Sequence, residues 1–266
     1  MVRKIIQILL SFGILIGIWE LAVIVGKFPT ALLPAPLQVL KAMGELYKSG
    51  LPGSTSQITL AGHIAVSLKR FFTGYILSVL AGVLLGLFFG WYPRIFVYFN
   101  PVIQLIRPIA PVAWMPFIVL LIGIGDTPAI VIIFLAGFFP VLLSTVAAVG
   151  GLDPVYLKLA ANFGLSKTET LRKVVFPDIF PQIMTSLHLA LSTAWIFLVS
   201  GEMVGAQSGL GFLIMDSKNA LRSDALLATM FTIGLIGFLL DLAMKEIEKL
   251  VAGKWGIGNT ATLQRD

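Results

Sequence analysis

The sequence predicts an all-α membrane protein with six transmembrane helices. Of its 266 residues, 58% are apolar and only 12% are charged, whereas a soluble domain carries about 25% charged residues. A helix needs about 20 apolar residues to cross a hydrocarbon core of roughly 30 Å, and six such runs occupy about half of the chain. The rest leaves no room for a separate catalytic domain, so a single transmembrane domain is expected over 1–266, with its core at 59–250.

The composition excludes several classes of function. The absence of cysteine excludes disulfides, thiolate metal sites and cysteine nucleophiles, and two histidines are too few for a metal cluster. The sequence has no phosphate-binding loop and no serine-hydrolase, aspartyl-pair or HExxH motif. We therefore expect no enzymatic activity, no ATP binding by this chain, and no bound metal or cofactor. The net charge of +6 is scattered at the ends of apolar runs, which is typical of membrane orientation rather than nucleic-acid binding.

The first two expected spans are 5–25 and 64–91. Arg3 and Lys4 precede the first run, which is longer than a signal-peptide core and lacks a small-x-small cleavage site, so an uncleaved span is expected. A proline-rich segment follows, and its amphipathic piece at 37–47 is expected at the membrane interface. The second span carries glycines at spacings of four and eight residues, which favour close helix contact on one face: Gly74, Gly82, Gly86 and Gly90.

The third apolar stretch, 95–125, contains four prolines and is expected to be a broken span. Backbone groups freed in this way are tolerated in a membrane only when they are buried in protein or line a watery path. Arg107, Pro108 and Pro111 therefore indicate a translocation path or gate. An arginine inside an apolar run costs about 2.5–3.5 kcal/mol on insertion scales. Arg107 either faces a cavity and attracts an anion or gates it, or it reaches the interface and bonds freed carbonyls.

The fourth span is expected at 126–149, with its helix start at Asp126 to Pro128. A helix, a turn and a second short helix follow at 153–181. Asp153 before Pro154 predicts the first start, Gly164 the first stop, and Ser166 with Glu169 a capping box. The two prolines at 177 and 181 are expected to stop the second short helix. Spans five and six are expected at 183–204 and 225–247, with a glycine-rich loop at 205–211 after span five.

Ionisable residues within the later spans leave alternatives open. His188 either faces the path or is a hydrogen-bonded packing residue. Glu202 either belongs to the path or gate, where it could relay protons, or it pairs with a polar group or sits near lipid headgroups. Asp241 is expected either to sit within the bundle or to pair with Lys245 four residues on, a spacing that places both on one helix face. His63 is expected at the membrane interface. The loop at 206–211 is either an anion-binding nest of free amides or a tight external turn.

Orientation follows from the distribution of lysine and arginine. With the amino terminus inside, eleven of these residues fall on the inner side and seven on the outer side. Cytoplasmic loops carry an excess of Lys and Arg. Both termini are therefore expected in the cytoplasm, with Lys69 and Arg70 as the outer residues that fit this arrangement least well.

The inner segment KLAANFGLSKTETLRKVVFPDIFP, at 158–181, resembles the cytoplasmic loop of permease subunits of ATP-binding-cassette importers. That loop has the pattern E-A-A, three residues, G, nine residues, I-x-L-P. The spacing matches throughout, and the matching residues are Ala160, Gly164, Val174, Phe176 and Pro177. Lys158 stands in place of the acidic residue and Leu159 in place of the first alanine. Two further stretches, 104–145 and 201–224, resemble the branch that serves nitrate, taurine and aliphatic sulfonates.

The resemblance implies a type I importer permease in the inner membrane of a prokaryote. Two copies would enclose a path, a binding protein outside the cytoplasm would deliver a small anion, and two separate ATPases would bind ATP and Mg²⁺. The loop at 153–181 would couple the path to the ATPases by alternating access. The implied coupling residues are Lys158, Ala160, Gly164, Ser166, Glu169, Val174, Phe176 and Pro177.

Two other functional classes remain open at this point. An ion-gradient-driven secondary transporter is permitted by the acidic residues Glu20, Glu202 and Asp241 within or near the spans. A membrane scaffold without transport activity is also compatible with the composition. The short six-span chain with a capped inner helix pair favours the ATP-driven importer.

Overall fold

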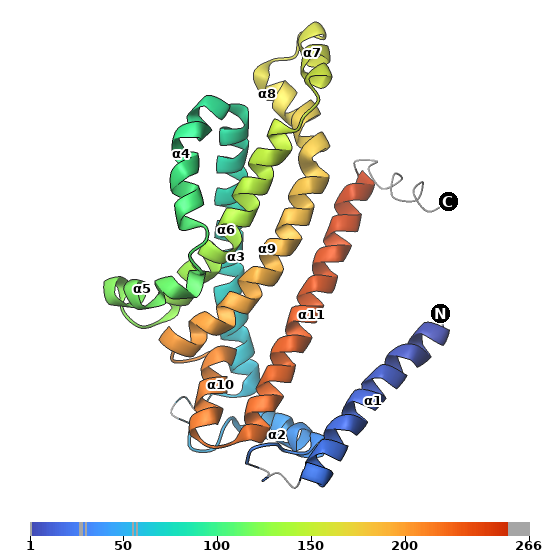
Figure 1. The fold of residues 1–266 in the computed structure, drawn as a ribbon, viewed down its shortest axis with the longest axis vertical. Helices are drawn as coiled ribbons and strands as arrows, with labels where there is room; N and C mark the ends of the chain where they lie inside the picture. Colours follow the sequence, from blue (N-terminus) through green and yellow to red (C-terminus); the bar gives the residue numbers. More distant parts are fainter. Residues whose placement is uncertain (1, 27–28, 30, 55, 57, 255–266) are drawn as a thin grey trace. The chain divides into compact units, whose positions relative to one another are not determined.

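The computed structural model describes residues 2–26, 29, 31–54, 56 and 58–254, and within these ranges the regular structure is helical throughout. Figure 1 shows the helices in chain order. Their bounds are α1 Val2–Gly26, α2 Pro36–Ser49, α3 Leu60–Trp91, α4 Pro93–Ile106, η1 Pro111–Trp114, α5 Met115–Ile122, α6 Asp126–Gly150, α7 Pro154–Asn162, α8 Lys167–Thr170, η2 Leu171–Val175, α9 Phe176–Gly205, α10 Leu210–Asn219 and α11 Ser223–Lys254.

Four helical stretches of the described chain are long and apolar enough to cross a membrane: Leu60–Trp91, Asp126–Gly150, Lys167–Gly205 and Ser223–Val251. The pair α4 and α5 passes the same test together but is bent by 83° at its break, which confirms that the helix is broken in this stretch. In α1, the apolar stretch Leu10–Gly26 is shorter. The count of six spans stays a prediction.

The chain divides into two compact units, Met1–Leu68 with Gln207–Leu235, and Lys69–Ala206 with Ile236–Asp266. In the first unit, the expected amphipathic piece forms α2, whose buried face consists of Val39, Ala42 and Leu46. Trp19 of α1 stacks on Phe231 of α11 with ring centroids 5.7 Å apart. The assignment of one transmembrane domain to the whole chain stays a prediction.

In the second unit, the glycines of α3 allow close contact with α6, as the sequence predicts. A Cβ atom built on Gly86 would lie 2.5 Å from the Cβ of Thr145, and one built on Gly90 would lie 2.5 Å from the Cβ of Val149. Real Cβ atoms essentially never approach so closely. Glycine at these positions therefore sets the distance between the two helices.

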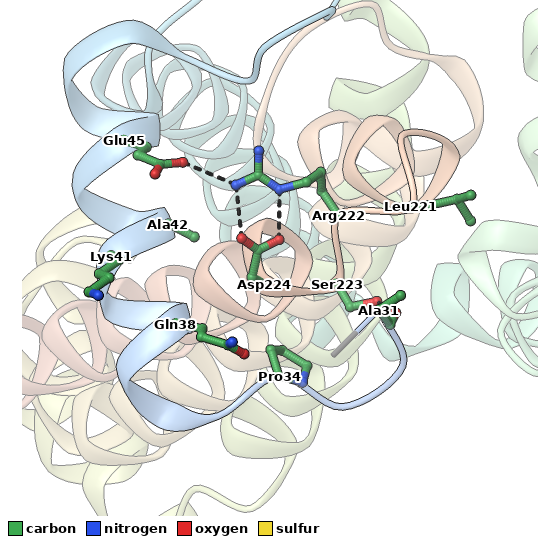
Figure 2. A pocket seen from close by; sticks show the side chains of 10 residues that line it. All are labelled: Ala31, Pro34, Gln38, Lys41, Ala42, Glu45, Leu221, Arg222, Ser223 and Asp224. Atoms are coloured by element: carbon green, nitrogen blue, oxygen red, sulfur yellow. Dashed lines mark hydrogen bonds and ion pairs between the residues drawn. The ribbon is translucent and has the colours of Figure 1, made fainter. Parts of the chain in front are cut away.

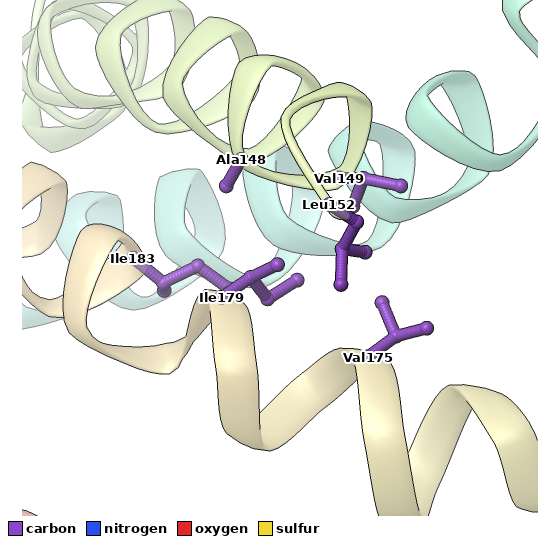
Figure 3. Packing of buried hydrophobic residues seen from close by; sticks show 6 residues of the cluster. All are labelled: Ala148, Val149, Leu152, Val175, Ile179 and Ile183. Atoms are coloured by element: carbon purple, nitrogen blue, oxygen red, sulfur yellow. The ribbon is translucent and has the colours of Figure 1, made fainter. Parts of the chain in front are cut away.

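α6 also packs along α9, and both ends of this helix pair are closed by apolar clusters. At one end, Met115 and Ile118 of α5 pack on Ile132 of α6. At the other end, Figure 3 shows Leu152, after α6, and Val175, before α9, pointing toward one another. The full membership of this second cluster is Ala148, Val149, Leu152, Val175, Ile179 and Ile183.

The structure corrects two expectations about helix ends and adds one helix that was not expected. The residue that caps α6 is Gly125, and Asp126 is already helical, with its carboxylate bound to Arg70 instead. Pro177 and Pro181 do not stop a helix, because η2 is a π-turn in which the Phe176 amide reaches back five residues. This wider turn accommodates the proline ring that follows it. The segment between spans five and six contains a helix, α10, that the sequence patterns did not indicate.

We predict that Gly86→Ala lowers the thermal unfolding temperature of the protein in detergent, because overpacking a filled contact typically costs about 1–3 kcal/mol. The added methyl group would meet Thr145 and the carbonyl oxygen of Leu142, 3.0 Å away. Gly234→Ala in α11 is the matched control, since nothing lies within 4 Å of its Cβ position. Unfolding is monitored by intrinsic tryptophan fluorescence. Equal unfolding temperatures for the two variants would contradict the close contact between α3 and α6.

Candidate functional site

The α7 helix is held at both ends by local hydrogen bonds. The Asp153 carboxylate accepts a hydrogen bond of 2.8 Å from the Val155 amide, which confirms the predicted start. At the other end, the Leu165 amide donates to Ala160 O and the Gly164 amide donates to Ala161 O, both at 3.0 Å. This is the Schellman arrangement, and it places Gly164 at φ +69°, where glycine is favoured.

The predicted capping box of α8 is confirmed. The Ser166 amide donates to Glu169 Oε2 at 3.1 Å, and the Glu169 amide donates to Ser166 Oγ at 3.3 Å. Lys173 donates to the other carboxylate oxygen at 2.9 Å. The hydrogen bond from Lys173, together with those from Ser166, lowers the pKa of Glu169 to about 2. The carboxylate is therefore ionised at neutral pH and fully engaged within the segment.

The α7–α8 segment is attached to the helix pair on both sides. Leu152 and Val175 bracket it and meet in the cluster of Figure 3. Of the motif residues, Ala160 is buried and Val174, Phe176 and Pro177 are half-buried, whereas Lys158 is exposed. The exposed end of the segment is apolar, since Phe163 keeps 81% of its surface exposed. The two attachments join the segment to the ends of α6 and α9.

Arg107 lies at the break between α4 and η1 and lines two cavities. One has a volume of about 160 Å³ and the other about 700 Å³. Pro111 lines the smaller cavity and Pro108 the larger, so the structure brings these three predicted residues together. The remaining lining of the smaller cavity is Ile109, Trp114, Leu135, Ala136, Phe139, Pro140, Thr193 and Phe197.

A third cavity of about 490 Å³ lies along the same two helices, α6 and α9. Pro140 lines both this cavity and the smaller Arg107 cavity, which makes them neighbours. The lining is rich in hydroxyl and amide groups, and its polar members are Ser144, Gln182, Thr185 and Ser186. The sequence analysis missed these residues, although their polar character within apolar runs is a signal that an analysis of helix faces could have used.

The structure places Glu202 in a buried ion pair, apart from the Arg107 cavity. Glu202 is fully buried and accepts a hydrogen bond of 2.7 Å from Arg70, whose side chain is 2% exposed. Arg70 Nε also donates to Asp126 at 2.9 Å. The guanidinium thereby joins α3, the first turn of α6 and the last turns of α9. Pairing with a polar group was one of the alternatives that the sequence left open for Glu202, and Arg70 was not identified as the partner.

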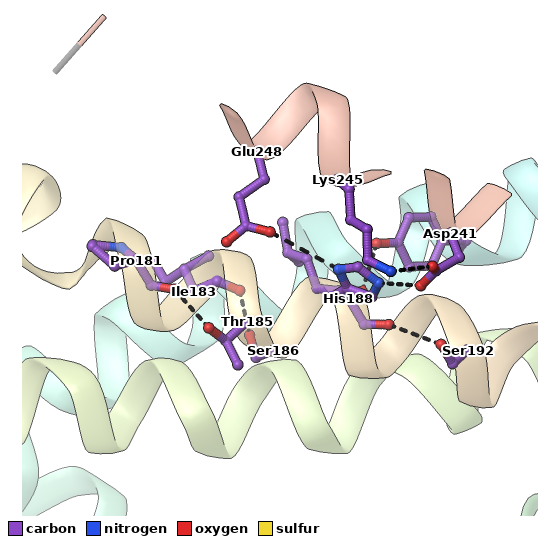
Figure 4. A network of polar contacts seen from close by, with 11 residues as sticks. Pro181, Ile183, Thr185, Ser186, His188, Ser192, Asp241, Lys245 and Glu248 are labelled. Atoms are coloured by element: carbon purple, nitrogen blue, oxygen red, sulfur yellow. Dashed lines mark hydrogen bonds and ion pairs between the residues drawn. The ribbon is translucent and has the colours of Figure 1, made fainter. Parts of the chain in front are cut away.

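The structure likewise places His188 outside the Arg107 cavity. Figure 4 shows its ring between two carboxylates of α11: Nε2 contacts Asp241, and Nδ1 lies 4.0 Å from Glu248. Lys245 donates to Asp241 at 2.6 Å, which confirms the predicted pair. The hydrogen-bonded role that the sequence left open for His188 is thus the one observed, and it ties α9 to α11.

In the first unit, Arg222 borders a cavity of about 360 Å³ beside α2 (Figure 2). It donates two hydrogen bonds to Asp224, at 2.9 and 2.8 Å, and one to Glu45, at 3.1 Å. The hydrogen bond to Asp224, reinforced by Glu45, raises the pKa of Arg222. The neighbouring Leu221 adopts φ +55° with 79% of its surface exposed, a conformation that is unfavourable for this residue type.

The amides of the loop at 206–211 are used within the fold. The Gly209 amide donates to His63 Nδ1 at 3.0 Å, and the Leu210 amide donates to Ser67 Oγ at 2.8 Å. These two amides begin α10, so the side chains of α3 cap that helix. The anion-nest alternative is therefore wrong for these amides. His63 is fully buried within the protein, and its position at the membrane interface stays a prediction.

The sequence profile of one family, described as "Binding-protein-dependent transport system inner membrane component", matches residues 78–253. The chain belongs to this family. The permease is 33% identical to the taurine transport system permease protein TauC of Escherichia coli, over 91% of this chain and 88% of that protein. It is 29% identical to the nitrate import permease protein NrtB of Leptolyngbya laminosa, over 90% of this chain and 85% of that protein.

Solved structures agree with this fold. A structure of the MetNI methionine ABC transporter in an inward-facing conformation superposes with a TM-score of 0.63 at 17% identity, covering 72% of this chain and 95% of that chain. The permease therefore has the type I importer fold. It is a non-catalytic, multi-pass membrane subunit of an ABC importer.

We predict that Arg70→Met destabilises the permease by about 3–5 kcal/mol, because it leaves the carboxylate of Glu202 buried without this cation. Adding Glu202→Met to this variant is expected to recover much of the loss. Lys69→Met is the control, since Lys69 is the exposed neighbour in the same helix. Denaturant unfolding in detergent measures the difference. A loss no larger than that of the control would show that the pair does not anchor the fold.

Proposed function

We propose that two copies of this permease form the channel of an importer for a small anion such as nitrate, a sulfonate, taurine or a bicarbonate-like ion. The observation that carries this proposal is the position of Arg107 at two cavities beside the 83° break between α4 and α5. A guanidinium in this place attracts an anion entering an otherwise apolar bundle. Relatives named for taurine and nitrate transport support the same substrate class.

The hydroxyl-lined cavity between α6 and α9 extends this path from Arg107 toward the α7–α8 segment. Hydroxyl and amide groups replace part of the hydration of a passing anion without holding it as tightly as a second cation would. Arg107 serves as the gate, with Pro108 and Pro111 keeping the backbone open beside it. His188 and Glu202 support the gate by fixing α9 to α11 and to α3, respectively.

The α7–α8 segment couples this path to ATP hydrolysis on two partner ATPases, which bind the ATP and Mg²⁺. Its exposed apolar end fits a groove on such a partner, and its two attachments pass the movement to α6 and α9. With both termini in the cytoplasm, the segment faces the ATPases, and a binding protein delivers the anion on the other side. The result is alternating access without covalent chemistry on this chain. Family membership favours this mechanism over an ion-gradient-driven one.

We predict that Arg107→Gln reduces ATP-driven uptake of the transported anion by about tenfold or more, because the cavity loses its cation. Uptake of radiolabelled taurine, nitrate and ethanesulfonate is measured in proteoliposomes that contain the ATPase and the binding protein. Arg94→Gln is the matched control, since Arg94 is also exposed but lines neither Arg107 cavity. Unchanged uptake in Arg107→Gln would contradict the proposed role of this residue.

We predict that Gly164→Val weakens co-purification with the ATPase, whereas Gly164→Asn largely preserves it. A β-branched residue is strained at φ +69°, and asparagine tolerates this conformation. No atom lies within 4 Å of the Cβ position, so the two variants differ in backbone strain rather than in clashes. Co-purification is followed in nanodiscs with purified candidate ATPases from the same cell. Failure of every ATPase to bind the wild-type protein would refute the coupling function.

A further inference from the structure

The exposed surface of the α7–α8 segment combines apolar and basic side chains. Val155, Tyr156 and Leu159 of α7 keep 52%, 45% and 46% of their surfaces exposed, and Phe163 keeps 81%. Three cations are exposed beside them: Lys158, Lys167 and Arg172. Apolar groups gathered at one place on a surface mark an interaction site. The three cations indicate that a partner at this surface carries negative charge.

The acidic residues of the segment are already engaged within it. Asp153 caps α7, and Glu169 is bound by Ser166 and Lys173. Among the residues that the structure describes, no ion pair joins Lys158, Lys167 or Arg172 to a carboxylate. These three exposed cations are therefore available to a partner of opposite charge.

The length of the helical stretch Lys167–Gly205 separates these cations from lipid. Its 39 residues extend about 58 Å, nearly twice the hydrocarbon thickness. Even with all of α9 placed inside the membrane, Lys167 lies about 13 Å beyond Phe176 along the helix axis. The segment thus projects past the headgroups, where a protein partner is available and anionic lipid is not.

We infer that the ATPase groove that receives α7 is acidic, with a carboxylate opposite Lys158. This inference rests on the proposed coupling function and names the chemistry of its partner. Lys158 is central because it is on α7 itself, one residue before Leu159 and two before the buried Ala160. In the importer loop that this segment resembles, the same position carries an acidic residue. The charge at this position is therefore opposite to that of the motif. A groove that is neutral or basic at this point would leave Lys158 desolvated without a counter-charge.

The test measures binding of the full-length permease, in nanodiscs, to each purified P-loop ATPase encoded in the same genome. Lys158→Glu is expected to weaken the binding of the cognate ATPase by about tenfold or more at low salt. Raising the salt concentration is expected to weaken binding of the wild-type permease and to reduce the difference in binding between wild type and Lys158→Glu. Lys218→Glu is the matched control: it makes the same charge change at an exposed lysine of α10. Changing the opposing ATPase carboxylate to lysine is expected to restore binding to Lys158→Glu.

The outcomes separate the inference from the proposed function. If the wild-type permease binds no ATPase, the coupling function fails and the inference with it. If the ATPase binds wild type and Lys158→Glu equally well at low salt, coupling stands and the acidic groove is overturned. If Lys158→Glu weakens binding in nanodiscs of anionic lipid but not of neutral lipid, the counter-charge is a lipid headgroup, and the inference is again overturned.

Discussion

The contact between α6 and α9 is the constraint on which the second unit depends. One end of this helix pair carries the cavity at Arg107, and the other end carries the apolar cluster that holds the coupling segment. Glycines of α3 fix a third helix against α6, and the guanidinium of Arg70 fixes the same three helices by charge. Packing and electrostatics therefore join the same three helices.

In the proposed function, this arrangement links the α7–α8 segment to the cavity at Arg107. The turn between α7 and α8 is closed by backbone hydrogen bonds, and its two attachments lie side by side in one cluster. Packed interiors deform little and transmit strain. Two polar contacts, Arg70 with Glu202 and His188 with Asp241, hold α9 at two further points.

Sequence patterns predicted the features that depend on a few neighbouring residues. The spacing of nearby residues predicts the capping box at Ser166, the helix stop at Gly164 and the smooth face of α3. The partner of Glu202 and the burial of His63 could not be predicted, because each depends on residues brought together from far apart. α10 was missed for the same reason, since its first amides are capped by α3.

The π-turn η2 has a consequence for the rotation of the helix that contains it. Its hydrogen bond spans five residues rather than four, which inserts one residue into the helix. Each added residue rotates everything that follows by about 100° around the axis. The wider turn absorbs this rotation, so the sequence periodicity of α8 is out of phase with that of α9 by one residue. The thirteen-residue separation of Gly164 and Pro177 includes this inserted residue, so a regular α-turn over the same thirteen residues would rotate α8 and the turn before it by about 100° around the axis of α9.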